Sequence, residues 1–209
     1  MPSYSECYKE YKNQYDWIAF FDIDEFLYIN DNRITNIKQF LSKDIYNDRG
    51  INCIRVCWKQ YDDSDILKTN GNYSIKKFKS YLPITNKNAV QTKPIIKTVL
   101  HDLTFTSAHG PVNDKNVVCV NTAGELCANA INIKNVTWEN ACLNHYRFKT
   151  IEEFVLNKMV RLWPTHHMNG GKTGLNLNMF FQFNKKTKEK IRYAEELIKK
   201  YNINRNEKL

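Results

Sequence analysis

One stretch of twelve residues, 16–27, constrains the fold more than any other part of the chain. Five consecutive apolar residues run from Trp17 to Phe21, and three acids follow at Asp22, Asp24 and Glu25. A short continuous apolar run is typical of a strand that is buried on both faces, as in a parallel sheet. We therefore predict a central parallel strand that ends in a group of carboxylates.

The two aspartates at the end of this predicted strand favour a metal site. Residues two apart along a strand point to the same face, so Asp22 and Asp24 are predicted to share one face. Neighbouring carboxylates repel each other unless a cation lies between them, and hard divalent cations prefer oxygen ligands. Ligands of open α/β sheets bind beyond the carboxyl ends of the strands. The alternative interpretation is a turn whose acids are simply solvated.

The same stretch resembles the aspartate signature of nucleotide-sugar glycosyltransferases with the GT-A architecture, and in particular the group of families 2 and 92. The matching positions are Trp17, Asp22, Asp24, Glu25 and Phe26. The resemblance implies transfer of a sugar, with inversion, from a nucleotide-diphosphate donor, expected to be a UDP-sugar, to a hydroxyl of a saccharide acceptor. Synthesis of a surface polysaccharide or glycan is the expected context.

A second match to that group lies later in the chain, in the same order as in the family. It is carried by Asn144, His145, Tyr146, Lys149, Thr150, Glu152, Glu153, Phe154 and Lys158. Thr150 and Glu153 also form the sequence pattern of a helix capping box, which predicts a helix from Ile151 onwards.

The resemblance assigns roles at a metal-dependent donor site. Asp24 is expected to bind Mn²⁺ or Mg²⁺ directly, and the cation acts as a Lewis acid toward the departing diphosphate. Asp22 is expected on the metal as well, or on the donor ribose or a metal-bound water. His145 is the predicted third metal ligand; the alternative is a histidine that packs near a helix start. His109 is a weaker rival for the same role.

Two lysines and one aspartate complete the predicted site. Lys93 and Lys97 lie in a stretch that resembles a strand of the family and are predicted to contact the diphosphate; alternatively they protect a sheet edge. Asp63 follows a predicted strand, at residues 51–58, that resembles the acceptor side of the family's cleft. It is the predicted carboxylate base for an inverting reaction, with Asp62 and Glu25 as rivals.

The predicted fold is a GT-A-like α/β fold, with a mainly parallel sheet flanked by helices and a small antiparallel element at 103–133. Residues 1–183 are predicted to form the catalytic domain, and residues 184–209 a basic C-terminal helix. In the resembled family a nucleotide-binding half precedes the aspartate signature, so we expect this chain to correspond to the C-terminal part of the family domain. That expectation keeps a second hypothesis open, a catalytically silent sugar- or protein-binding module that retains the fold.

The amino-acid composition restricts the classes of partner that the chain is expected to bind. The 209 residues are 42% hydrophobic and carry a formal net charge of +9. Such a charge is compatible with a sugar nucleotide, an anionic membrane surface or nucleic acid. We disfavour nucleic acid because the basic C-terminal segment has few aromatic residues among its charges and no recognition motif. Six cysteines without paired spacing favour reduced thiols and a cytoplasmic location, with peripheral contact to the inner face of the membrane as a further expectation.

Overall fold

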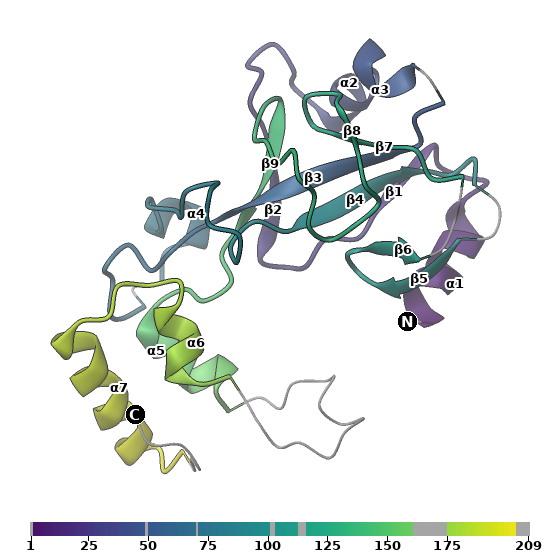
Figure 1. The fold of residues 1–209 in the computed structure, drawn as a ribbon. Helices are drawn as coiled ribbons and strands as arrows, with labels where there is room; N and C mark the ends of the chain where they lie inside the picture. The colour runs from purple at the N-terminus through teal and green to yellow at the C-terminus, as the bar shows by residue number, and fades with distance from the viewer. Residues whose placement is uncertain are drawn as a thin grey trace. The chain divides into compact units, whose positions relative to one another are not determined.

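The computed structural model describes residues 2–48, 50–69, 71–100, 103–112, 116–160 and 175–203. The chain divides into two compact units (Figure 1): residues 1–60 with 83–145, and residues 61–82 with 146–209. We call them the first and the second unit. This division differs from the predicted boundary at 183/184, because the C-terminal helix belongs to the same unit as residues 146–183.

The first unit is built on a seven-stranded mixed sheet. Its strands are β1 (Trp17–Ala19), β2 (Glu25–Ile29), β3 (Cys53–Gln60), β4 (Thr92–Lys97), β7 (Cys119–Asn121), β8 (Leu126–Cys127) and β9 (Ala141–His145). β3 lies at the centre, antiparallel to β4 and parallel to β7 and β9. The pairs β1–β4, β2–β9 and β7–β8 are antiparallel. The prediction of a mainly parallel sheet is therefore wrong: among the described strands, only the pairs β3–β7 and β3–β9 are parallel.

The apolar run at Trp17–Phe21 does not form the central strand. It supplies β1, a short strand at one end of the sheet, whereas β3 is buried at all but one of its positions. Trp17 and Phe21 pack against one hydrophobic cluster, and Ile18 and Phe20 pack against another. Side chains of this run thus pack against apolar clusters on both sides of β1, which explains an unbroken apolar run at a sheet edge, although no residue of β1 is fully buried and Ala19 is exposed.

Helices and a hairpin complete the first unit. They are α1 (Pro2–Tyr11), α2 (Ile37–Leu41), α3 (Asp44–Asn47) and the antiparallel pair β5 (Thr104–Ser107) and β6 (Gly110–Val112). α1 lies beside the hairpin in Figure 1, where the Phe105 amide donates to the Ser5 hydroxyl at 2.9 Å. The fully buried Tyr8 ring lies 5.8 Å from the Phe105 ring.

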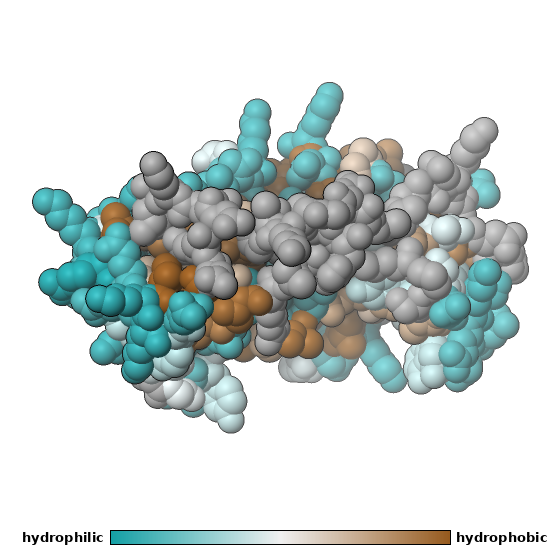
Figure 2. All heavy atoms as spheres, turned by 90° about the horizontal axis from the view of Figure 1, so that it is seen from below, coloured by the Kyte–Doolittle hydropathy of each residue, from teal (hydrophilic) through white to brown (hydrophobic). Residues whose placement is uncertain are grey.

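The second unit is helical in its described parts. It contains α4 (Ser74–Lys77), α5 (Ile151–Glu153), a π-helical segment η1 (Phe154–Lys158), α6 (Leu177–Phe181) and α7 (Lys188–Lys200). The predicted capping box is present: the Thr150 hydroxyl accepts from the Glu153 amide at 3.1 Å, and the Glu153 carboxylate accepts from the Thr150 amide. α7 buries Ala194 and Leu197. Hydrophilic residues gather over this helix, at the left of Figure 2.

Candidate functional site

The pairing of β2 with β9 assembles the candidate site within the first unit. Glu25 lies directly opposite His145 in this antiparallel pair. A turn precedes β2, closed by a hydrogen bond from the Glu25 amide to the Asp22 carbonyl at 3.0 Å. This geometry brings His145 Nε2 to 3.8 Å from Asp24 Oδ1. Asp24 of the signature and His145 of the second sequence match therefore lie next to each other.

The two signature aspartates lie in this turn and not on the face of a strand as predicted. Ile23 between them is fully exposed, which is the outcome of a turn that projects from the sheet. Asp22 and Asp24 consequently have different neighbours. Asp24 lies beside His145, and Asp22 contacts Lys93.

Lys93 links two of the acids through a buried ammonium group. Its Nζ lies 2.9 Å from Asp22 Oδ2 and 3.4 Å from Glu25 Oε2, and the Asp22 amide donates to Glu25 Oε2 at 2.9 Å. The side chains of Lys93 and Glu25 are fully buried, whereas that of Asp22 is 53% exposed. The ion pairs of Lys93 thus hold the turn from its buried side. The predicted contact of Lys93 with a diphosphate stays a prediction, and the structure gives its ammonium carboxylate partners.

Glu25 is an unusual carboxylate because, among the described residues, only one of its two oxygens, Oε2, has a polar partner. Burial raises its pKa, and the hydrogen bond from the Asp22 backbone and the charge of Lys93 oppose that rise. Its second oxygen, Oε1, is buried and has no hydrogen-bond partner in the part of the chain that the structure describes. A buried acid in this setting costs folding free energy, which is typical of functional sites.

Two histidines flank Trp58, the aromatic residue of β3. The Trp58 ring centroid lies 4.2 Å from that of His145 and 5.2 Å from that of His109. His109 Nδ1 is 3.0 Å from the Thr92 carbonyl oxygen, and burial lowers the pKa of His109. His109 therefore packs next to the site, and of the two histidines it is His145 that contacts an acid of the signature.

A buried arginine, which the sequence analysis missed, fixes the turn that carries His109. The Arg55 guanidinium is 1% exposed and donates to the carbonyl of His109 and to the side chain of Asn129. Gly110 follows with φ +140°, and a Cβ there would lie 2.9 Å from Arg55 Nη2. Glycine is thus required for the close approach of this backbone to Arg55.

Lys97 lies away from the acids of the signature. It lies four residues after Lys93 on β4, a distance of about 13 Å along a strand. Its Nζ is 3.3 Å from the Tyr46 carbonyl oxygen and 5.0 Å from the centroid of the Trp17 ring. The prediction that both lysines contact one diphosphate is therefore not supported by this arrangement.

Asp63, the predicted base, belongs to the second unit and has a structural partner there. Lys190 Nζ lies 2.7 Å from Asp63 Oδ2 and 2.9 Å from Asp65 Oδ1. The Asp63 side chain is 2% exposed, and its amide donates to the Asn184 side chain at 2.7 Å. A general base must reach the acceptor hydroxyl, so a carboxylate enclosed in an ion pair is poorly suited to that role. Its rival Asp62 accepts hydrogen bonds from Ser64 and Ser80 in the same unit.

The described residues contain no group of three or more His, Cys, Asp and Glu side chains arranged to hold a metal ion. The predicted trio is divided, since Asp22 is engaged by Lys93 while Asp24 and His145 remain adjacent. A carboxylate oxygen and an imidazole nitrogen at this separation are two donors of types that Mn²⁺ accepts, which leaves other coordination positions for a ligand. The residues present thus fit a divalent cation held by two side chains.

Comparison with known proteins places this chain in a family. The model of glycosyltransferase family 92 matches residues 1–208. The chain belongs to glycosyltransferase family 92. No curated protein and no solved structure matches it. Membership confirms the predicted glycosyltransferase function at the level of the family, and nucleotide sugar and acceptor are the general partners of such a protein. Among the described helices, none has the length and apolar character needed to cross a membrane.

Proposed function

We propose that this family 92 glycosyltransferase binds a divalent cation, Mn²⁺ or Mg²⁺, through Asp24 and His145, and with it the diphosphate of a nucleotide-sugar donor, a UDP-sugar. The observation that supports this proposal is the 3.8 Å approach of His145 Nε2 to Asp24 Oδ1, across the β2–β9 pair. When bound, the cation would neutralise the negative charge that develops on the departing diphosphate. We further propose a GT-A-like fold and an inverting transfer to a saccharide hydroxyl in glycan or surface polysaccharide synthesis.

The other residues of the site keep this pair in position. Lys93 holds Asp22 and Glu25 from the buried side, so the turn carrying Asp24 is anchored at both ends. Asp22 remains 53% exposed and can accept a hydrogen bond from a donor hydroxyl. Trp58 packs against the His145 ring and limits its rotation. Preorganisation of this kind reduces the free energy lost when a ligand is ordered.

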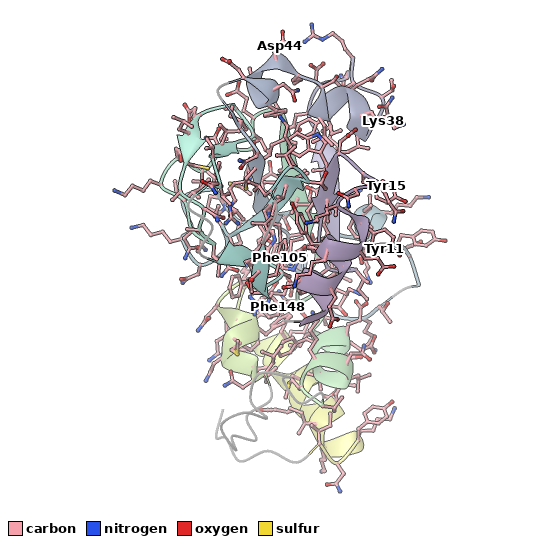
Figure 3. The ribbon with its side chains drawn as sticks, turned by 90° about the vertical axis from the view of Figure 1, so that its right-hand side faces the viewer. Tyr11, Tyr15, Lys38, Asp44, Phe105 and Phe148 are labelled. Atoms are coloured by element: carbon pink, nitrogen blue, oxygen red, sulfur yellow. The ribbon has the colours of Figure 1, made fainter. Side chains whose placement is uncertain are left out.

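A titration calorimetry experiment with UDP tests the proposal. We expect UDP to bind in the presence of MnCl₂ and to bind weakly or not at all in EDTA. Asp24→Asn should weaken binding by about tenfold or more, the effect of losing one charged ligand. Asp44→Asn is the matched control, because Asp44 is an exposed aspartate of the same unit and is labelled in Figure 3.

Two results would contradict the proposal. The first is UDP binding that is insensitive to Mn²⁺ and to Asp24→Asn. The second is the absence of UDP binding combined with binding of a saccharide, which would favour the catalytically silent sugar-binding module.

A further inference from the structure

A hollow of the first unit lies away from the signature acids, where α2 meets the ends of β1 and β4. It has a volume of about 790 Å³, and Trp17, Lys38, Lys97, Thr98 and Asp16 are among its lining residues. Hollows of this size hold small organic ligands or several units of a polymer. Lys97 and Lys93 are separated by about 13 Å along β4, so this hollow is distinct from the proposed donor site.

Two lysine side chains, those of Lys97 and Lys38, contribute positive charge to this hollow. Lys97 is partly buried, and burial lowers its pKa. Within the described part of the chain its Nζ contacts the Tyr46 carbonyl and the Trp17 ring and has no carboxylate within 4.0 Å. Lys38 of α2 adds a second, exposed ammonium group, and Asp16 is the one acid among the lining residues. A partly desolvated ammonium without an anionic partner favours an anionic ligand.

Two exposed tyrosines precede the lining residues Asp16 and Trp17 in the chain. Tyr15 is 59% exposed and Tyr11 36%, and their ring centroids are 6.1 Å apart. Thr98, which lines the hollow, donates its hydroxyl to the Tyr15 carbonyl and its amide to the Asp16 carbonyl at 3.0 Å, which holds the Tyr15 backbone next to a lining residue. Figure 3 shows Lys38, Tyr15 and Tyr11 along one side of the sheet. Exposed aromatic rings offer an apolar face and a polar tip to a ligand that has both kinds of surface.

We infer that this hollow binds an acidic saccharide, a sugar chain bearing carboxylates. Lys97 and Lys38 contact the carboxylate, and Tyr15 and Tyr11 pack against the C–H faces of neighbouring sugar rings. Inorganic phosphate would satisfy the lysines and leave the tyrosines unused, and a neutral saccharide would leave Lys97 without a counter-charge. The combination of both features therefore selects a charged sugar. This binding is independent of the cation at Asp24 and His145.

Titration calorimetry of the full chain with a hexameric oligogalacturonate in EDTA tests this inference, with maltohexaose and sodium phosphate as comparison ligands. We expect oligogalacturonate to bind more tightly than either, and the affinity to fall with added NaCl. Lys97→Met and Tyr15→Ala should each weaken binding about fivefold to tenfold, the loss of about 1 to 1.4 kcal/mol. Lys199→Met and Tyr73→Ala are the matched controls, since both positions are exposed in the second unit.

The inference is overturned if maltohexaose or phosphate binds as well as oligogalacturonate, if none of them binds, or if the control variants lose as much affinity. Tyr15→Ala covers the case in which Lys97→Met fails to fold, because Tyr15 is exposed. Asp24→Asn distinguishes the two sites: it should weaken UDP binding and leave oligogalacturonate binding unchanged. Loss of both would place the saccharide at the signature acids and overturn the second site.

Discussion

Glu25 and His145 lie directly opposite each other on β2 and β9. Because the two strands are antiparallel, this register places the residue before Glu25 next to the imidazole, and Asp24 approaches His145 Nε2. The Glu25 side chain contacts Lys93 on the buried side of the turn. The β2–β9 pairing thus positions both the proposed metal ligands and the buried ion cluster that supports them. A substitution in the cluster should therefore also shift the positions of the ligands.

Lys93→Met should be strongly destabilising. The change leaves the carboxylate of Glu25 buried without its cation, and removal of one partner of a buried ion pair typically costs about 3–5 kcal/mol. Asp22 should contribute little to this loss because water screens its half-exposed carboxylate. Urea unfolding followed by circular dichroism gives the free energy of unfolding of each variant.

The double variant Lys93→Met/Glu25→Leu provides the control for this prediction. With both charges replaced by apolar side chains, most of the lost stability should return, since well-packed apolar residues often replace a buried pair at little cost. A single variant that costs less than about 1 kcal/mol, or a double variant that is no more stable than Lys93→Met, would contradict the role given to Lys93.

The two histidines that pack on Trp58 make a matched test of the metal ligand. His145→Gln should weaken Mn²⁺ binding by about tenfold, because an amide is a poorer ligand than the imidazole beside Asp24. His109→Gln should leave Mn²⁺ affinity nearly unchanged, since the His109 ring contacts the Thr92 carbonyl. Electron paramagnetic resonance of free Mn²⁺ measures both affinities without an activity assay. The reverse order of effects would identify His109 as the ligand.

Gly110→Ala should destabilise the first unit through its contact with Arg55. A Cβ at Gly110 would lie 2.9 Å from Arg55 Nη2, and the backbone φ of +140° is itself strained for alanine, so we expect a loss of about 2–3 kcal/mol. Gly50→Ala is the control, because Gly50 also has a positive φ but a Cβ there would meet nothing within 4 Å. Equal losses in urea unfolding would mean that the contact with Arg55 is unimportant.

Local patterns predicted individual elements of this fold well. The β-branched stretch at 51–58 predicted β3, and the polar pattern at Thr150 predicted the helix start, because both depend on neighbours in the sequence. The order and direction of the strands could not be predicted in this way. A continuous apolar run indicates that both sides of a strand contact apolar side chains, and the run at Trp17–Phe21 does so at the sheet edge, where no residue of β1 is fully buried.

The candidate site was predictable in its residue types and only partly in its geometry. The family resemblance predicted that His145 lies with Asp24, but the β2–β9 register that brings them together was not predicted. The engagement of Lys93 by acids, and the role of Arg55, depend on contacts between distant segments. Lys190 had an available signal: it lies four residues before Ala194 and seven before Leu197, which is the buried face of α7.

Lys190 leads to a prediction for the second unit. Burial tends to lower its pKa, but hydrogen bonds to Asp63 and Asp65 outweigh that effect, and the pKa is raised above the usual 10.5. A raised pKa in the folded state contributes stability that is fully present below pH 10.5 and is lost as the pH rises through the folded value. The unfolding free energy should therefore fall as the pH increases above 10.5.

Urea unfolding between pH 9 and pH 12, followed by circular dichroism at the helical signal, measures this dependence. Lys190→Met should be less stable by about 3–5 kcal/mol at pH 9, because Asp63 then lacks its buried partner. Its stability should also fall less steeply above pH 10.5 than that of the unmodified protein. Lys188→Met, an exposed lysine of the same helix, should retain both the stability and the alkaline slope. An unchanged slope in Lys190→Met would show that the loss of the Lys190 proton does not govern the alkaline unfolding of this unit.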